Sequence, residues 1–281
     1  MDSRGSGRLA RVTSCLAILA IGAGTGAGAA GAEEIELAPH RAVYDISLDQ
    51  VRGSLGVTNI SGQLVFEIRG SACQGYTVNR RFVSQVTGDD MNTTSDQQLS
   101  TFEAADGSVY RFISRSFFDD SLSEQTDGRA AREDDRVVVE LSEPDQVRVE
   151  LPGDVLFPFQ HLKVLLGAAR AGETILRADV YEGTDTGRTL YQTNTVIGDR
   201  RARGDVPEVE GAGALEDVDS WPVSIAYFDD DGDGPAELPT YQFSYDLYAN
   251  GVSSRMKLDY EEFALNGELV SLDFLEPTPC D

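Results

Sequence analysis

Two cysteines remain in this chain once its first 32 residues are set aside, and that pair constrains the fold more than any other feature. The first 32 residues begin with spaced arginines, continue through the apolar run 16–21 and end in small residues at Ala32. This order is typical of a secretory signal peptide, so we expect residues 1–32 to be removed. The apolar run is also shorter than the roughly 20 residues that a membrane-spanning helix needs. The mature chain, residues 33–281, is therefore expected to be soluble and exported.

Cys73 and Cys280 are the cysteines of the mature chain, because Cys15 lies inside the expected signal peptide. An even number of cysteines in an exported protein predicts a disulfide between them, since disulfides persist outside the cytosol. The bridge would close a loop of roughly 200 residues and stabilise the fold by at most roughly 5 kcal/mol. Two buried free thiols are the alternative. A redox-active pair is disfavoured, because the Cys-x-x-Cys spacing that lowers a thiol pKa is absent.

The chain is strongly acidic, with 23 basic and 48 acidic residues and a formal net charge of −25. Such a charge repels phosphate backbones and anionic lipid head groups, so nucleic acid is excluded as a partner. We interpret most of the acidic residues, which are spread along the chain, as surface residues that keep the protein soluble. A mature length of about 250 residues fits one large β domain or two smaller ones, and we expect a single domain over residues 33–281.

From residue 41 onward, apolar and polar residues alternate over short runs that end at Gly, Asp, Asn or Ser. Alternation with a period of two places every second side chain on the same face, so each run predicts a strand with one buried face. The close succession of runs indicates a mainly β, antiparallel fold. The predicted strands cover 43–48, 63–68, 76–86, 98–102, 110–117, 136–141, 147–151, 174–181, 189–197, 223–228, 241–248, 256–263 and 269–275.

Three dipeptides that tolerate positive φ angles indicate tight hairpin turns. Asp106-Gly107 lies between two strand-like runs, as do Asn250-Gly251 and Asn266-Gly267, and the last two predict a meander near the C-terminus. Residues 198–220 are charged, contain glycines and have little apolar content. We expect them to form a long mobile loop between strands.

One segment has the spacing of a helix. Pro158 can occupy the first helical turn and Gly172 can end the helix. A single helix among strands must pack its apolar face on a sheet. We therefore expect it either to cover an open end of a barrel or to fill the interior of a curved sheet. The apolar residues at helical spacing are Phe159, Leu162, Leu165, Leu166 and Ala169.

Five short motifs occur in order along the mature chain. They are Pro39-His40-Arg41-Ala42 with Tyr44, Cys73 with Gly75 and Tyr76, Phe157-Pro158 with His161, Trp221-Pro222-Val223 with Tyr227-Phe228, and Asn250-Gly251-Val252 with Leu258-Asp259-Tyr260. Together with Cys280 near the C-terminus, they resemble the EipB family of alphaproteobacterial cell-envelope integrity proteins over nearly the whole mature chain.

The resemblance implies a periplasmic protein whose strands form a large, unclosed, spiral β-barrel with one helix inside it, similar in shape to the periplasmic lipoprotein carriers. It also implies the bridge between Cys73 and Cys280. The family's role is maintenance of the envelope and resistance to envelope stress, with no established catalysis. A tetratricopeptide-repeat protein is the partner that the resemblance implies. The acidic segment 229–234 departs from the family's motifs.

His40 and His161 are the two histidines of the chain, and we interpret both as structural. No nucleophile signature such as Gly-x-Ser-x-Gly accompanies them, so we expect no catalytic residue. His40 is expected to bind backbone groups or a carboxylate, and His161 to occupy a hydrogen-bonding position at the helix start. The two lie too far apart in sequence to indicate a zinc site once both cysteines are bridged. We expect no cofactor.

Asp229, Asp231 and Asp233, followed by Gly234, match the first half of a calcium-binding loop. The twelfth position, where a bidentate glutamate belongs, is Thr240, and the flanking segments are predicted strands instead of helices. We interpret the segment as a solvated acidic hairpin loop. Weak calcium binding at millimolar concentrations is the alternative.

Aromatic residues are numerous in the predicted strand 241–248. Tyr241, Phe243 and Tyr245 share one face of it, so that face must be buried or bound. With Phe159 of the predicted helix, they are the candidates to line an apolar groove for a ligand. Ordinary core packing is the alternative.

The sequence features and the family resemblance together suggest two functions of different classes. The first is a non-enzymatic periplasmic protein that supports the envelope by binding another envelope protein, with its scaffold locked by the disulfide. The second is a periplasmic carrier that binds a lipid or a hydrophobic peptide in the curve of its sheet. An enzyme is disfavoured, because the chain contains no catalytic constellation.

Overall fold

The computed structural model describes residues 35–280, apart from 53–55, 90, 185 and 230–237. The expected signal peptide, residues 1–32, lies outside the described residues. Within them the chain forms fourteen strands, the helix α1 (Pro158–Ala171) and the short 3-10 helix η1 (Ala212–Leu215). The strands are β1 (His40–Val51), β2 (Val57–Ser71), β3 (Gly75–Gly88), β4 (Asn92–Glu103), β5 (Val109–Phe118), β6 (Ser121–Glu133), β7 (Arg136–Glu143), β8 (Val147–Pro152), β9 (Ile175–Val180), β10 (Tyr191–Ile197), β11 (Ser220–Asp229), β12 (Tyr241–Tyr248), β13 (Ser253–Tyr260) and β14 (Phe263–Phe274).

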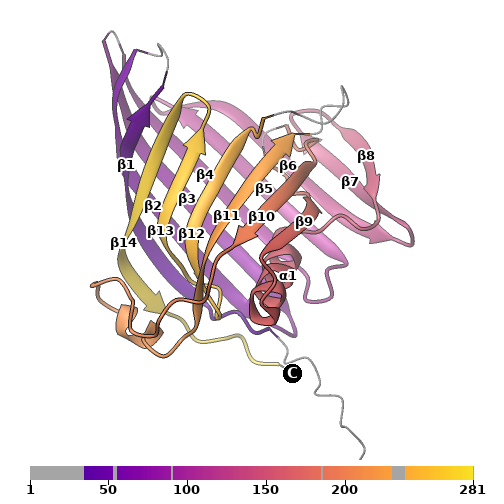
Figure 1. Ribbon diagram of the computed structural model, residues 1–281. Helices are drawn as coiled ribbons and strands as arrows, with labels where there is room; N and C mark the ends of the chain where they lie inside the picture. The colour runs from indigo at the N-terminus through magenta and orange to yellow at the C-terminus, as the bar shows by residue number, and fades with distance from the viewer. Residues whose placement is uncertain (1–34, 53–55, 90, 185, 230–237, 281) are drawn as a thin grey trace, which may run out of the picture. The chain divides into compact units, whose positions relative to one another are not determined.

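All of the described strands belong to one sheet, in the order β8-β7-β6-β5-β4-β3-β2-β1-β14-β13-β12-β11-β10-β9. Figure 1 shows the sheet curving so that the magenta strands of the first half pass behind the orange and yellow strands of the second half. The two ends of the order, β8 and β9, are not paired with each other, so the sheet stays unclosed. The predicted mainly β, antiparallel, unclosed fold is confirmed.

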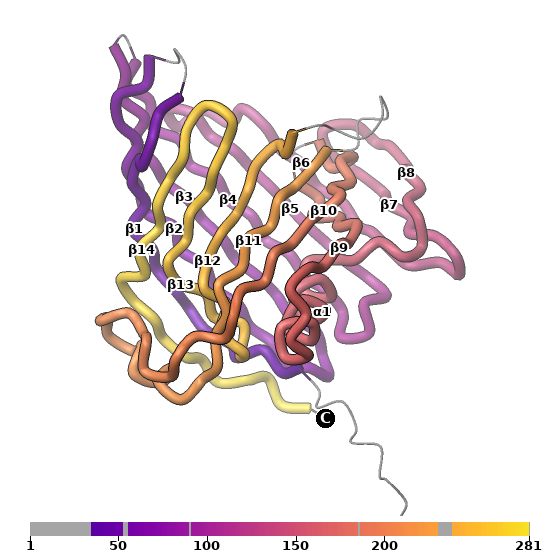
Figure 2. The backbone as a smooth tube through the Cα atoms, in the orientation of Figure 1, coloured from indigo at the N-terminus to yellow at the C-terminus, as the bar shows by residue number. Residues whose placement is uncertain are grey.

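The pairing of β1 with β14 joins the two halves of the chain into one sheet. Its register runs from His40 opposite Phe274 to Val51 opposite Phe263. Figure 2 shows the indigo start of the chain lying beside its yellow end along this seam. Tyr44 of β1 is buried beside this seam, and its hydroxyl donates a hydrogen bond to the carbonyl oxygen of Ser253, at 2.9 Å.

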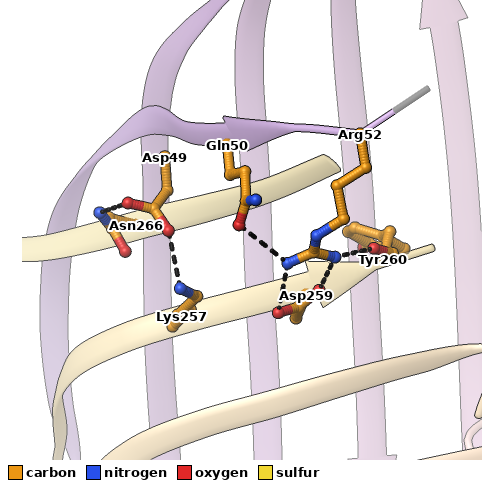
Figure 3. A network of polar contacts seen from close by, with 7 residues as sticks. All are labelled: Asp49, Gln50, Arg52, Lys257, Asp259, Tyr260 and Asn266. Atoms are coloured by element: carbon orange, nitrogen blue, oxygen red, sulfur yellow. Dashed lines mark hydrogen bonds and ion pairs between the residues drawn. The ribbon is translucent and has the colours of Figure 1, made fainter. Parts of the chain in front are cut away.

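Polar contacts on the outer face reinforce this seam near the end of β1 (Figure 3). Arg52 reaches past β14 and binds both carboxylate oxygens of Asp259 on β13, at 2.5 and 2.9 Å. Asp49 accepts hydrogen bonds from Lys257, at 2.7 Å, and from Asn266, at 3.0 Å. Each exposed pair contributes little alone, but together they connect three neighbouring strands.

Helix α1 connects β8 to β9 and packs between the two halves of the sheet. Leu165 and Leu166 share a hydrophobic cluster with Tyr76 from the first half and with Trp221 and Ile225 from the second half. The helix therefore lies inside the curve at one end of the sheet (Figure 1), so it combines the two arrangements that its sequence allowed. As predicted, Pro158 stands at its start and Gly172, with a φ of 77°, ends it.

Two of the three predicted turns are confirmed and one is wrong. Asp106-Gly107 connects β4 to β5, and Asn250-Gly251 connects β12 to β13. Asn266-Gly267 instead lies within β14, and the chain reverses at residues 261–262. Packing is tight there, since a Cβ at Gly267 would lie 3.0 Å from the Ile46 side chain and 3.1 Å from that of Met256.

Strand β6 has no counterpart among the predicted strands, and β2 and β4 are longer than predicted. The inner face of β6 carries the small residues Thr126, Gly128 and Ala130, so it lacks the alternation of large apolar residues that marks a buried face. Small residues are required here, because a Cβ at Gly128 would come within 2.6 Å of Phe112.

Residues 198–220 form the predicted long loop between β10 and β11, and part of this loop is packed onto the sheet. Ala212 and Leu215 of η1 are fully buried in a cluster with residues of the seam. Asp246 of β12, which is also buried, pairs with Arg201 of this segment at 2.7 Å and with Arg255 at 2.6 Å. The charged residues that suggested solvation instead hold the segment in place.

The structure contains the predicted disulfide. Cys73, in the turn between β2 and β3, is bonded to Cys280 in the tail that follows β14, with their Cα atoms 5.9 Å apart. Hydrogen bonds accompany the bridge, from Gln74 Nε2 to the carbonyl oxygen of Pro279 at 2.8 Å and from the amide of Thr278 to the carbonyl oxygen of Gly70 at 3.2 Å. The tail is thus held against the first half of the sheet.

Replacing both cysteines with serine tests the contribution of this bridge. We expect Cys73→Ser/Cys280→Ser to lower the free energy of unfolding by up to roughly 5 kcal/mol, because the unfolded chain is released from a long closed loop. Thermal and urea denaturation of the oxidised proteins measure the loss. Gln74→Ala, which removes one tail hydrogen bond, is the control. Equal stability of the double variant and the wild type would contradict a structural role.

Candidate functional site

The aromatic residues predicted to line a groove lie on the inner face of β12. Tyr241, Phe243 and Tyr245 are each partly buried, and the rings of Phe243 and Tyr245 are 4.6 Å apart. Tyr241 stacks on Tyr227 with ring centroids 4.4 Å apart. Phe159 of α1 belongs to the same cluster but is only 6% exposed and packs on Tyr76, so it is a core contact of the helix.

Further apolar residues lie on the same inner face. They alternate with polar residues along strands on both sides of the seam, pack against the buried cluster and keep part of their surface accessible. With Phe243 and Tyr245 they form what we term the inner apolar face. Its other members are Leu48, Leu64, Phe66, Phe82, Val86, Leu258 and Phe263.

A polar region follows the inner apolar face toward β5 and β6. Arg80 lies on the inner face of β3, where its register neighbours are Phe66 and Leu99. With Gln97 and Ser114 it lines a small cavity of about 140 Å³. Arg80 forms no ion pair with any residue that the structure describes. The inner surface is thus amphipathic, with apolar walls beside a polar cavity that is lined by the cation of Arg80 and the carboxylate of Glu124.

The start of helix α1 is held by a carboxylate from a distant strand. The N-cap residue, Phe157, has no side-chain acceptor, and the first amides of a helix need partners. Glu103, at the end of β4, accepts hydrogen bonds from the amides of Phe159 and Gln160, at 2.8 and 2.9 Å. Arg132 of β6 donates to Gln160 Oε1 at 3.1 Å. These contacts fix the helix to the first half of the sheet.

Glu103 is only 2% exposed, and burial raises its pKa to about 7 although the two helix amides and the charge of Lys163 lower it. Its ordinary value is 4.5. The folded state therefore binds this proton more tightly than the unfolded state does. Protonation of Glu103 therefore stabilises the folded state fully below pH 4.5, and this stabilisation is lost as the pH rises through 7.

The Glu103→Gln variant tests this titration. Between about pH 8 and pH 5, we expect the wild type to gain up to about 3 kcal/mol of stability relative to the variant, because the variant has no proton to bind there. Urea denaturation at a series of pH values measures the difference. Glu150→Gln, at an exposed carboxylate of β8, is the control. Parallel stability profiles for wild type and Glu103→Gln would contradict the raised pKa.

Both histidines are buried. His40 Nδ1 lies 2.7 Å from the carbonyl oxygen of Ala38, so this ring binds a backbone group, and burial lowers its pKa. His161 donates its backbone amide to the carbonyl oxygen of Phe157 at 2.8 Å, as expected at a helix start, but its Nε2 has no hydrogen-bond partner in the described structure. Burial lowers the pKa of His161 to about 4, so its ring is neutral at pH 7. Among the described residues, no hydrogen bond joins either histidine ring to a serine, threonine or cysteine side chain.

The calcium candidate falls mostly on residues that are not described. Asp229 ends β11 and pairs in register with Tyr191, whereas Asp231 and Asp233 lie outside the described residues. Within the described ranges, no group of three or more His, Cys, Asp or Glu side chains is arranged to hold a metal ion. In the same ranges, no helix has the length and apolar character needed to cross a membrane.

Comparison with known proteins agrees with this architecture. A solved structure of a beta-barrel-like protein from Brucella abortus, described as a domain of unknown function, matches with a TM-score of 0.80 and 37% identity. The match covers 86% of this chain and 100% of that one. The fold and the inner apolar face therefore place this chain in the class of beta-barrel-like proteins.

The sequence comparisons then identify the family. The EipB-like family model matches residues 31–276. The cell envelope integrity protein EipB of Brucella abortus is 37% identical over 257 residues, which cover 90% of each chain. The chain belongs to the EipB-like family, as its motifs suggested. The relative's name describes a role in the envelope.

Proposed function

We propose that this protein supports the integrity of the cell envelope as a non-enzymatic binding protein of the periplasm. The observation that carries the proposal is the 37% identity, over 90% of both chains, with a cell envelope integrity protein. In this view residues 1–32 direct export, residues 33–281 act as a single domain, and the protein contributes to resistance against envelope stress. The name of this relative describes envelope integrity and no catalytic activity, which supports the proposal of a role without catalysis.

The partner that we propose is another envelope protein, of the tetratricopeptide-repeat class that the family resemblance implies. Helical repeats of this class stack into extended concave surfaces that bind other proteins. The seam between β1 and β14 and the tail bridge between Cys73 and Cys280 give the sheet a fixed shape. A fixed shape lowers the entropic cost of association, which favours a scaffold that presents its surface to such a partner.

A carrier function is the second candidate, and the inner apolar face is the observation that favours it. Phe66, Phe82, Phe243 and Tyr245 keep accessible apolar surface on the inside of the sheet. Arg80 adds a cation without an ion-pair partner among the described residues. A lipid or hydrophobic peptide with one anionic group would match both features, since ligand pockets combine apolar walls with few polar contacts.

One preparation tests both candidates. We expect chemical crosslinking in intact cells to join the protein to one envelope protein, and we expect native mass spectrometry of uncrosslinked material to show the bare chain. A lipid adduct without a crosslinked partner would contradict the scaffold and support the carrier. In that case Phe243→Asp should lose the adduct, whereas Gln242→Asp, on the same strand but exposed, should keep it.

A further inference from the structure

The outer face of β2–β6 carries side chains in three rows that run across the strands. The rows follow from the register of the four strand pairs, and their members alternate with the buried residues of the inner face. The first row is Val65, Arg81, Gln98, Arg115 and Gln125; the second is Glu67, Asn79, Ser100, Ile113 and Asp127; the third is Arg69, Thr77, Phe102, Arg111 and Arg129.

A depression of about 480 Å³ lies over the first two rows, and we term it the outer groove. Its middle is low because Asn79 and Ser100 are short, and they are joined by a hydrogen bond of 3.0 Å. The longer Arg81 and Arg115 rise beside them in the first row. Ile113, 36% exposed, adds an apolar surface. The groove therefore offers polar, cationic and apolar groups side by side.

The arginines of the three rows outnumber the carboxylates, although the whole chain has a net charge of −25. Arg69 pairs with Glu67 and Arg81 with Asp96, but these arginines are 57% and 60% exposed. Exposed ion pairs contribute little to stability, so their arginines can exchange partners at small cost. A local positive surface thus persists on an acidic protein.

Arg111 and Arg129 stand directly opposite each other on β5 and β6 in the third row. Both are exposed, and neither forms an ion pair with another described residue. Like charges that face each other across a strand pair are destabilising. An anionic group bound between them would remove this repulsion and could accept hydrogen bonds from both guanidinium groups.

We propose that the outer groove, together with the arginines of the third row beside it, binds an extended, carboxylate-rich segment of a protein partner. This inference rests on the proposed binding function and names the surface and the partner's chemistry. Five strands spaced about 4.8 Å apart give the rows a length that about six residues of extended chain can span. Asn79 and Ser100 can bind the backbone of such a segment, while the arginines bind its carboxylates.

The ends of the second row favour carboxylates over phosphates. Glu67 and Asp127 occupy the outermost strands of that row. They repel a compact dianionic phosphate more than a single carboxylate, and the net charge of −25 opposes nucleic acid on the scale of the whole protein. A chain with spaced single charges avoids both penalties.

Charge reversal at the unpaired arginines tests the proposal. The probe is a fluorescein-labelled peptide of about eight residues that alternates glutamate and alanine, and fluorescence anisotropy measures its binding. We expect Arg111→Glu/Arg129→Glu to bind about tenfold more weakly than wild type, because attraction becomes repulsion. We also expect wild-type affinity to fall between about 20 mM and about 150 mM salt, where exposed charges become screened.

The matched control is Arg170→Glu/Arg177→Glu. It makes the same charge change at two exposed arginines, in the last turn of α1 and on β9, outside the rows of β2–β6, and should bind the peptide like wild type. Thermal melting shows whether both double variants fold. Equal loss of binding in the two variants, or no binding by the wild type in low salt, would overturn the proposal. Inorganic phosphate that binds at Arg111 and Arg129 more tightly than the peptide would overturn the choice of carboxylates.

Crosslinking in cells separates this inference from the proposed function. A partner captured by wild type and lost in Arg111→Glu/Arg129→Glu, but kept in the control, supports both. A partner captured equally by all three proteins contradicts the groove and leaves the binding function standing. Failure of the wild type to capture any envelope protein contradicts the binding function. The peptide assay would then still show whether the groove binds carboxylates.

Discussion

The antiparallel pairing of β1 with β14 is the contact on which the rest of this structure depends. It places the start of the described chain beside its end, with His40 opposite Phe274, and so joins β2–β8 to β9–β13 in one sheet. Without it, each half would be a meander with an exposed edge and an uncovered apolar face. The disulfide acts in the same direction, because it fastens the tail after β14 to the turn between β2 and β3.

The joined halves create two surfaces of different chemistry. Helix α1 fills part of the interior and is fixed to the first half by Glu103, Gln160 and Arg132. The remaining interior keeps an apolar face with Arg80 at its polar end. The outer face instead presents the arginine rows of β2–β6. A single sheet therefore separates an apolar binding surface from a charged one, and the two proposed kinds of ligand address opposite faces.

Local sequence patterns predicted what depends on local chemistry. Alternation located most strands, Pro158 and Gly172 marked the ends of α1, and cysteine parity predicted the bridge. Strand β6 escaped because its inner residues are small where Phe112 needs space. Asn266-Gly267 was misread as a turn, because the close packing of Ile46 and Met256 around Gly267 arises only in the folded sheet. The outer groove and the cap from Glu103 also require register and tertiary contact, so no local pattern could indicate them.

Amide hydrogen exchange followed by mass spectrometry tests the central role of the seam most directly. We expect the amides of β1 and β14 to be among the slowest to exchange and both strands to be exposed in the same opening step, since neither half is stable without the other. Exchange of β9–β14 as a group, while β1–β8 remain protected, would show that the first half holds its structure alone and would contradict the account.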